Sequence, residues 1–230
     1  MVTEQRTTRD PASERTTVRR RADRGSYDQG LAYAILDEGL VAHVGIAADQ
    51  GPVVIPMLYA RDGDRLLLHG SPASRLLRTA GSTGTNVCVT VTLIDGLVLA
   101  RSVFHHSANY RSVVVFGQAR RIDDLAERRA ALEHLVETLV PGRGADARPP
   151  NDVELRGTTV LALPLDELSV KVREGGVLDE DEDYDLPVWA GVVPITTVAD
   201  DPIPDPALPA DAPPIPDYAR AYARPSPRPR

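Results

Sequence analysis

The chain has 230 residues, of which 42% are hydrophobic, and this is enough apolar content to bury a core of useful size. Its aromatic residues are 1 Trp, 7 Tyr and 2 Phe, so the core must be packed mainly from aliphatic side chains. So few planar rings argue against a platform on which nucleic acid bases stack. The formal net charge of −7 argues against binding along a phosphate backbone.

Compartment and membrane association also leave marks in a sequence. Cys88 is the single cysteine, which excludes an internal disulfide and any paired-cysteine redox or zinc motif. No apolar run approaches the roughly 18 residues of a membrane span, and the N-terminus is polar where a signal peptide is apolar. We therefore expect a cytoplasmic protein with neither nucleic acid nor membrane as its partner.

The two ends of the chain differ from its middle in composition. Residues 1–24 are rich in arginine and almost free of apolar side chains, which predicts a flexible basic arm. Residues 196–230 are rich in proline, which predicts a disordered, extended tail. The folded domain is expected over residues 25–195.

The first half of that domain is mostly strand-like after one helix. Ser26 is a suitable N-cap for a short helix that ends at Gly39. Short β-rich runs follow at 40–47, 53–60 and 64–70, with a tight Asp-Gly hairpin at residues 61–64. A short helix is expected over 72–79. The runs 86–94 and 96–104 meet at Asp95-Gly96, which predicts a second hairpin.

The second half continues the sheet. The longest expected strand covers 110–122, and a helix with one apolar face follows over 123–140. Two further strands are expected at 158–165 and 167–173. Six to seven antiparallel strands joined mostly by tight turns, with few flanking helices, predict a mainly β fold that curls into a barrel.

A phosphate site is the first candidate for chemistry, in the stretch HGSPASRLLR at 69–78. A strand ends there and a helix is expected to begin, so unpaired backbone N–H groups and the hydroxyls of Ser71 and Ser74 meet the guanidinium of Arg75. The alternative interpretation is a helix cap beside a surface arginine.

A second polar group lies at the start of the longest strand. Asn109, Tyr110, Arg111 and Ser112 offer several donors to a ligand, and the alternative is a polar turn before a strand. His105 and His106 are adjacent on an extended chain and point to opposite sides, and the other histidines are scattered. We therefore expect no metal site. The acidic run 179–183 is expected to be a solvated linker.

Taken in order, three stretches resemble the pyridoxamine 5'-phosphate oxidase-like flavoproteins of the FMN-binding split β-barrel fold. They are VVIPMLYARDGDRLLLHGSPASRLLR, DGLVLARSVFHHSANYRSVVVFGQA and the closing VLALPLDELSVKVREGG with YDLPVWAGVVPI. The resemblance covers about 25–195 and is strongest to the flavin-nucleotide-binding branch that includes nitroimidazole-resistance proteins. It implies a homodimer with FMN held in a groove between protomers.

The resemblance also implies roles for particular residues. The second strand would run along the isoalloxazine ring at Ile55, Pro56, Met57 and Leu58. The turn after the third strand would hold the phosphate through His69, Ser71, Ser74 and Arg75. The long strand would reach the flavin of the partner subunit through Asn109, Tyr110, Arg111 and Ser112. Trp189 would cover the flavin edge, with simple packing of its ring as the alternative.

The function expected from this resemblance is that of an FMN-dependent oxidoreductase acting on a small molecule, with NAD(P)H as a possible electron donor. His69 and His106 are the candidates for substrate contact, because a histidine can exchange a proton near neutral pH. A nitroreductase-like detoxifying enzyme is a narrower version of the same function. The alternatives from other classes are a flavin- or haem-binding carrier or sensor without turnover, and a β-barrel interaction protein.

Overall fold

The structure is a computed structural model, and it describes residues 10–73 and 84–224. Most of its regular elements are antiparallel strands. Its strands are β1 (Gly25–Ser26), β2 (Val41–Ala48), β3 (Gly51–Asp62), β4 (Arg65–Gly70), β5 (Thr85–Leu99), β6 (Ser107–Arg121), β7 (Thr159–Pro164), β8 (Glu167–Arg173) and β9 (Gly191–Pro194). Its α-helices are α1 (Gln29–Glu38), α3 (Leu125–Leu139), α4 (Arg143–Asp146), α5 (Asp152–Arg156) and α6 (Asp217–Arg220).

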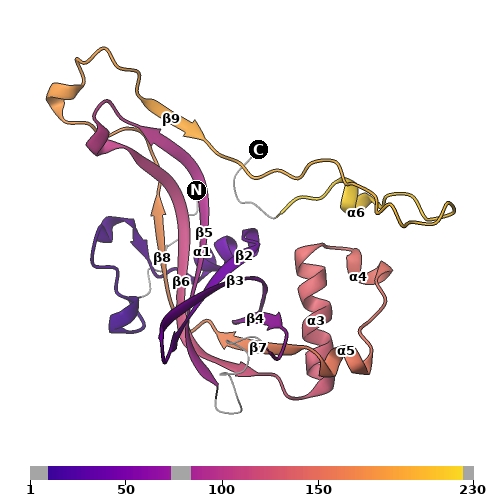
Figure 1. Ribbon diagram of the computed structural model, residues 1–230. Helices are drawn as coiled ribbons and strands as arrows, with labels where there is room; N and C mark the ends of the chain where they lie inside the picture. Colours follow the sequence, from indigo (N-terminus) through magenta and orange to yellow (C-terminus); the bar gives the residue numbers. More distant parts are fainter. Residues whose placement is uncertain (1–9, 74–83, 225–230) are drawn as a thin grey trace, which may run out of the picture.

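Six of the strands form a barrel, and β1, β8 and β9 extend the sheet beyond it. The sheet order is β1-β8-β6-β7-β4-β3-β2-β5-β9, and an additional pairing of β6 with β5 closes the ring β6-β7-β4-β3-β2-β5. β8 shares one edge of β6 with β7, and β9 adds to the far end of β5. The long strands β5 and β6 extend beyond the barrel as a two-stranded hairpin, the β5–β6 hairpin (Figure 1). The expected class, a mainly antiparallel split β-barrel with a few helices, is confirmed.

Alternation of buried and exposed residues explains why these segments form strands around one core. In β2 the buried residues are Ala42, Val44 and Ile46, and in β5 they are Val87, Val89 and Val91. α1 covers this core with its buried face, while α3 packs on a second, smaller cluster around Leu67. Tyr59 is the one aromatic residue among the buried residues of the core in the described chain, as the aromatic-poor composition predicts.

The hydroxyl of Tyr59 joins the barrel to the end of α1. It donates a 2.6 Å hydrogen bond to the carbonyl oxygen of Leu36, and burial raises the pKa of the phenol. A Cβ at Gly39 would stand 2.6 Å from this hydroxyl, so the glycine that ends the helix also makes room for the contact. This bond fixes where α1 ends over the barrel.

Replacing Tyr59 with phenylalanine is expected to lower the free energy of unfolding by about 1–2 kcal/mol, because the buried Leu36 carbonyl loses its donor. Urea unfolding measures the change. Tyr33→Phe is the matched control, since the Tyr33 hydroxyl bonds to Asp64 at an exposed position. Equal losses in the two variants would contradict a specific role for the buried bond.

The Asp95-Gly96 pair does not form the expected hairpin. β5 runs without a break from Thr85 to Leu99, and the pair is a bulge where the register with β6 shifts between Ile94 and Gly96. The chain turns later, at the short helix Val103–His105. The prediction was wrong because the pairing of β5 with β6 continues on both sides of the bulge, and Val193 of β9 leaves no room for a side chain at Gly96.

Two other expectations need smaller corrections. Asp28 rather than Ser26 caps α1, through a 2.6 Å bond that its carboxylate accepts from the Leu31 N–H, and Ser26 belongs to β1. The sheet has nine strands within the described ranges instead of six to seven, because β1 and β9 are added at its edges. Most of the helix expected over 72–79 lies outside the described residues.

Residues 10–24 of the arm lie against the outer side of β8. The Arg15 guanidinium contacts the Glu167 carboxylate at 2.5 Å and stacks over the ring of Phe116. Thr16 is 1% exposed, and the Lys171 ammonium donates to the carbonyl oxygen of Arg20 at 2.8 Å. These contacts place the arm on the fold, while its flexibility stays a prediction.

The tail crosses the molecule and returns to the helices. After β9 it runs to α6 beside α4, as Figure 1 shows. The Tyr222 hydroxyl then bonds to the Leu139 carbonyl at the end of α3 at 3.0 Å, and Arg224 reaches the end of α1. The last described residues of the tail therefore contact two helices of the domain.

Candidate functional site

The barrel opens between β3 and β4. β3 pairs with β2 along Gly51–Leu58, but it pairs with β4 only over Tyr59–Asp62. On the side away from β2, the backbone of residues 51–58 therefore has no strand partner in the described parts of the chain. We call this opening the split. Unpaired strand edges present N–H and C=O groups to whatever lies beside them.

The four predicted ring contacts lie along the open edge of β3. Ile55 and Met57 turn inward and pack on the core, while Pro56 and Leu58 turn outward. Proline has no N–H to donate, which suits a strand position at an open edge. A planar ligand in the split would meet backbone polar groups here and apolar side chains on both sides.

The end of β4 forms the other side of the split. Leu68 is the last β4 residue opposite β3, so His69 and Gly70 follow at the point where the two strands separate. Ser71 is exposed, and its hydroxyl accepts a 3.2 Å bond from the N–H of Ala73. Ser74 and Arg75 lie outside the described residues, so their part in a phosphate site stays a prediction.

His69 is the most unusual side chain at the split. Its Nδ1 is buried and has no hydrogen-bond partner among the residues that the structure describes. Burial lowers the pKa of the imidazole below its ordinary value, so the ring is neutral near pH 7. A neutral imidazole keeps one nitrogen lone pair, which can accept a proton or bind a metal ion.

A pH dependence of stability follows from His69. Its folded-state pKa lies below the unfolded value of about 6.5, so its contribution is complete above that pH and is lost as the pH falls through the folded pKa. We expect the cofactor-free protein to lose up to about 1.4 kcal/mol per pH unit from this group in that window. Urea unfolding at about pH 7.5 and about pH 5.5 measures it.

The matched variants for this pH dependence are His69→Gln and His106→Gln. The first is expected to reduce the difference in stability between the two pH values. The second variant, at the exposed tip of the β5–β6 hairpin, is expected to leave the difference unchanged. An unchanged difference in the His69 variant would contradict this assignment.

The other predicted contacts lie away from the split of the same chain. β2 and β5 stand between β3 and the residues Asn109–Ser112 of β6, which is roughly 14 Å at the usual strand spacing. Trp189 is 67% exposed beside β9, and His106 bonds to the Ser102 carbonyl at the tip of the β5–β6 hairpin. Within the chain the structure therefore brings His69, Ser71 and residues 55–58 together and leaves Asn109–Ser112, Trp189 and His106 apart from them.

Arg111 has a structural position that the sequence did not show. Its guanidinium bonds to both oxygens of Glu38, at 2.5 and 2.9 Å, and to both oxygens of Asp95, at 2.8 and 3.0 Å. The side chains are 6%, 17% and 7% exposed. We call these residues the Arg111 triad. It joins α1, the bulge of β5 and β6, and the two carboxylates raise the pKa of Arg111.

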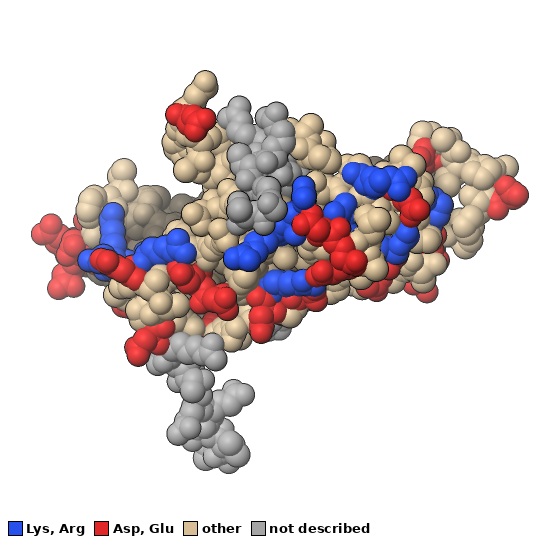
Figure 2. Space-filling model, turned by 90° about the horizontal axis from the view of Figure 1, so that it is seen from below, with Lys and Arg blue, Asp and Glu red and all other residues tan. Residues whose placement is uncertain are grey.

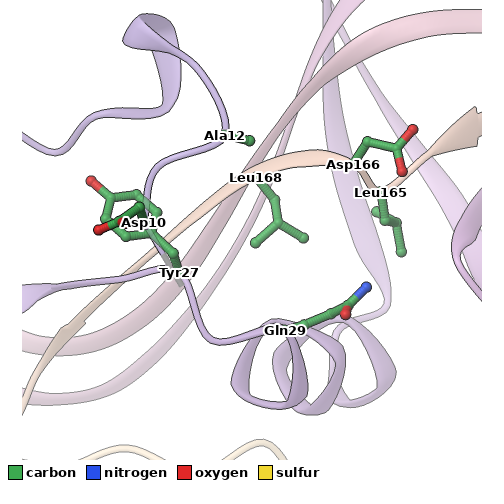
Figure 3. A pocket seen from close by; sticks show the side chains of 7 residues that line it. All are labelled: Asp10, Ala12, Tyr27, Gln29, Leu165, Asp166 and Leu168. Atoms are coloured by element: carbon green, nitrogen blue, oxygen red, sulfur yellow. The ribbon is translucent and has the colours of Figure 1, made fainter. Parts of the chain in front are cut away.

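A small cavity elsewhere is chemically unlike the split. It has a volume of about 150 Å³ and lies between the arm, the start of α1 and the turn from β7 to β8 (Figure 3). Asp10 and Asp166 line it, together with Tyr27, Gln29 and Leu168. Two carboxylates disfavour an anionic ligand in so small a space.

Charged side chains of both signs are mixed on one face of the surface (Figure 2). Figure 2 shows basic and acidic side chains side by side on the face turned to the viewer. The ion pairs of Arg65 with Asp62 and Glu127 are an example of this mixing. The described residues include no helix long and apolar enough to cross a membrane. They also include no group of three or more His, Cys, Asp or Glu side chains that could hold a metal ion.

Comparison with known families agrees with this fold. The family model described as pyridoxamine 5'-phosphate oxidase matches residues 28–172. The chain therefore belongs to the pyridoxamine 5'-phosphate oxidase family, as the resemblance in its sequence predicts. No curated protein sequence matches the chain.

Solved structures extend the similarity over nearly the whole chain. The flavocytochrome Anf3 from Azotobacter vinelandii is 39% identical, with a TM-score of 0.88, and the match covers 94% of this chain and 100% of that one. An FAD and haem binding protein from Mycobacterium smegmatis is 36% identical, with a TM-score of 0.82, and the match covers 87% of this chain and 98% of that one. A protein from Bacteroides thetaiotaomicron, described in connection with 5-nitroimidazole antibiotic resistance, is 26% identical, with a TM-score of 0.54, and covers 64% and 86%.

Proposed function

We propose that this protein is a redox protein that binds a flavin nucleotide in the split and also binds haem. The observation that carries the proposal is the 39% identity to a flavocytochrome over 94% of this chain and all of that one. The 36% identical FAD and haem binding protein supports the same pair of cofactors. Similarity over 94% of the chain must include parts of the arm and of the tail as well as the barrel.

The residues at the split fit a flavin. The open edge of β3 offers backbone donors and acceptors of the kind that the polar edge of an isoalloxazine ring needs. The apolar side chains of Pro56 and Leu58 stand beside it, and Gly70 and Ser71 follow at the predicted phosphate end. When bound, the flavin supplies the transfer of hydride or of single electrons.

His69 fits a haem ligand. A histidine that holds haem iron does so through a free nitrogen of its neutral imidazole, and His69 has a lowered pKa and an Nδ1 without a hydrogen-bond partner among the described residues. Leaving such a buried nitrogen unpaired is costly, and coordination by iron would remove that cost. The role of this residue would then be to hold the haem and to tune its potential.

FMN and FAD are both compatible with this site. The resemblance in the sequence favours FMN, whereas one relative is described as binding FAD. The two cofactors share the ring and the first phosphate, so the split serves either. Acid extraction of the purified protein followed by chromatography identifies the nucleotide.

We also propose a homodimer. Apolar side chains on the outer face of β2, β3 and β5 are uncovered, and their exposures are 42% for Val41, 61% for Val54, 46% for Leu58, 46% for Ile94 and 44% for Leu97. A second copy on this face would bring the partner's β6 toward the split, which is the role that the family resemblance implies for Asn109 and Tyr110. Light scattering of the purified protein tests the dimer, and a monomer at all concentrations would contradict it.

The central experiment measures cofactor content. The purified protein is expected to show flavin absorbance and a haem Soret band. His69→Ala is expected to lose the Soret band and keep the flavin, while His106→Ala keeps both. A protein that takes up neither added flavin nor added haem would contradict the proposed function.

Turnover separates an enzyme from a carrier. NADH or NADPH oxidation is measured with oxygen and other acceptors, against the same concentration of free flavin. Oxidation faster than free flavin supports an oxidoreductase. No increase supports the carrier or sensor that remains the alternative.

A further inference from the structure

Arg173, the last residue of β8, is a buried cation without a buried anion. It is 7% exposed, and within the described ranges no carboxylate lies within ion-pair distance of its guanidinium. Arg111 on the adjacent strand β6 is also buried, but it has anionic partners. Arg111 faces Val172 on β8 and is 5% exposed, but it is neutralised by two carboxylates.

The acceptors that Arg173 does have are neutral. One terminal nitrogen donates to the side-chain oxygen of Asn109, and the other donates to the Gly176 carbonyl at 3.2 Å. Its Nε–H has no acceptor among the residues that the structure describes. Burial lowers the pKa of the guanidinium, and repulsion by Arg24 lowers it further. An unpaired charge in such a place is unfavourable until an anion joins it.

The surroundings hold the guanidinium in a fixed position. The Asn109 amide nitrogen donates to the Gly175 carbonyl at 3.0 Å, which turns its oxygen toward Arg173. Gly175 has φ of 118°, a left-handed conformation that suits glycine and lets the chain turn back over the end of β8. Tyr110 lies opposite Arg173 across the strand pair, on the same side of the sheet.

The same place is open to a ligand. A Cβ built on Gly175 or on Gly176 would meet no atom within 4 Å, so space remains above this turn. A fixed guanidinium with spare N–H groups, a second cation and a phenol hydroxyl match the needs of a phosphate or carboxylate group.

We propose that Arg173, oriented by Asn109 and supported by Arg24 and Tyr110, binds an oxyanion, the phosphate or carboxylate group of a small ligand. This site is three strands away from the split of its own chain and is distinct from it. The phosphates of a flavin nucleotide, the propionates of haem and free inorganic phosphate share this chemistry. The site itself requires none of them in particular.

The test uses the purified full-length protein with inorganic pyrophosphate as the probe, and sodium chloride at matched ionic strength as the reference. Pyrophosphate is expected to raise the melting temperature of the wild type above the chloride value. In Arg173→Met the apparent affinity is expected to fall by about tenfold or more. Arg120→Met is the matched control and is expected to keep the response. Arg120 is an exposed residue of β6 whose guanidinium donates to the side-chain oxygen of Gln118.

Asn109→Asp provides a second variant that keeps the guanidinium. It places a carboxylate beside Arg173 without changing the size of the side chain, so the melting temperature without anion should rise and the pyrophosphate response should disappear. A full response in both variants, or no response in the wild type, would overturn the proposal.

Cofactor content in the same variants identifies the source of the anion. Loss of flavin from Arg173→Met with haem retained assigns the site to flavin phosphate, and the reverse assigns it to a haem propionate. Retention of both with loss of the pyrophosphate response assigns it to a free anion. A wild type without either cofactor would count against the proposed function, while the pyrophosphate response still decides the oxyanion site.

Discussion

Replacing Arg111 with methionine is expected to lower the free energy of unfolding by about 3–5 kcal/mol. The variant removes the cation that the largely buried carboxylates of Glu38 and Asp95 share, and the loss of this neutralisation is the cause of the destabilisation. Urea unfolding near neutral pH measures the change. Arg121→Met is the matched control on the same strand, because its pair with Asp123 is exposed, and it should change stability by no more than about 1 kcal/mol.

A second set of variants separates the charge from the packing. In the Arg111→Met background, Glu38→Gln and Asp95→Asn together remove both carboxylate charges, and we expect them to recover a large part of the lost stability. Equal stability with and without these two changes would show that loss of packing, rather than loss of the shared cation, causes the effect.

The strands were predictable where a local pattern decides the structure. Alternating apolar residues predicted β2, β3 and β4, and the Asp62-Gly63 turn joins β3 to β4 as expected, with Gly63 at φ of 57°. The same dipeptide at Asp95-Gly96 predicted a turn and gave a bulge. The difference lies in distant contacts, because the sequence does not show that β9 and the Arg111 triad meet at that point.

The candidate site was predictable in part for the same reason. His69, Ser71 and residues 55–58 belong to two consecutive strands, so their proximity follows from one hairpin. That hairpin does not reveal where β3 and β4 separate, which depends on the pairing of β4 with β7. The buried state of Arg173 and the partners of Arg111 depend on residues about 70 positions away in the chain. No local sequence motif therefore predicts them.

The end of the tail is expected to stabilise the domain. Arg224 donates to the carbonyl oxygens of Asp37, Glu38 and Gly39 at the end of α1, at 3.3 Å to Glu38 and 2.9 Å to Gly39. It also donates to the Thr138 carbonyl of α3 at 2.7 Å. Carbonyl groups at the C-terminal end of a helix have no partner within it and carry partial negative charge, so one guanidinium satisfies two helices at once.

Arg224→Ala is therefore expected to lower the free energy of unfolding by about 2–3 kcal/mol. Arg220→Ala, on the exposed α6 of the same tail, is the matched control and should cost no more than about 1 kcal/mol. Urea unfolding measures stability, and hydrogen exchange at the last turns of α1 and α3 locates the effect. Glu38 at the end of α1 contacts both Arg224 and Arg111, so a double-mutant cycle of these two arginines is expected to show coupling between them. Unchanged stability and exchange in Arg224→Ala would show that the tail rests on the helices without holding them.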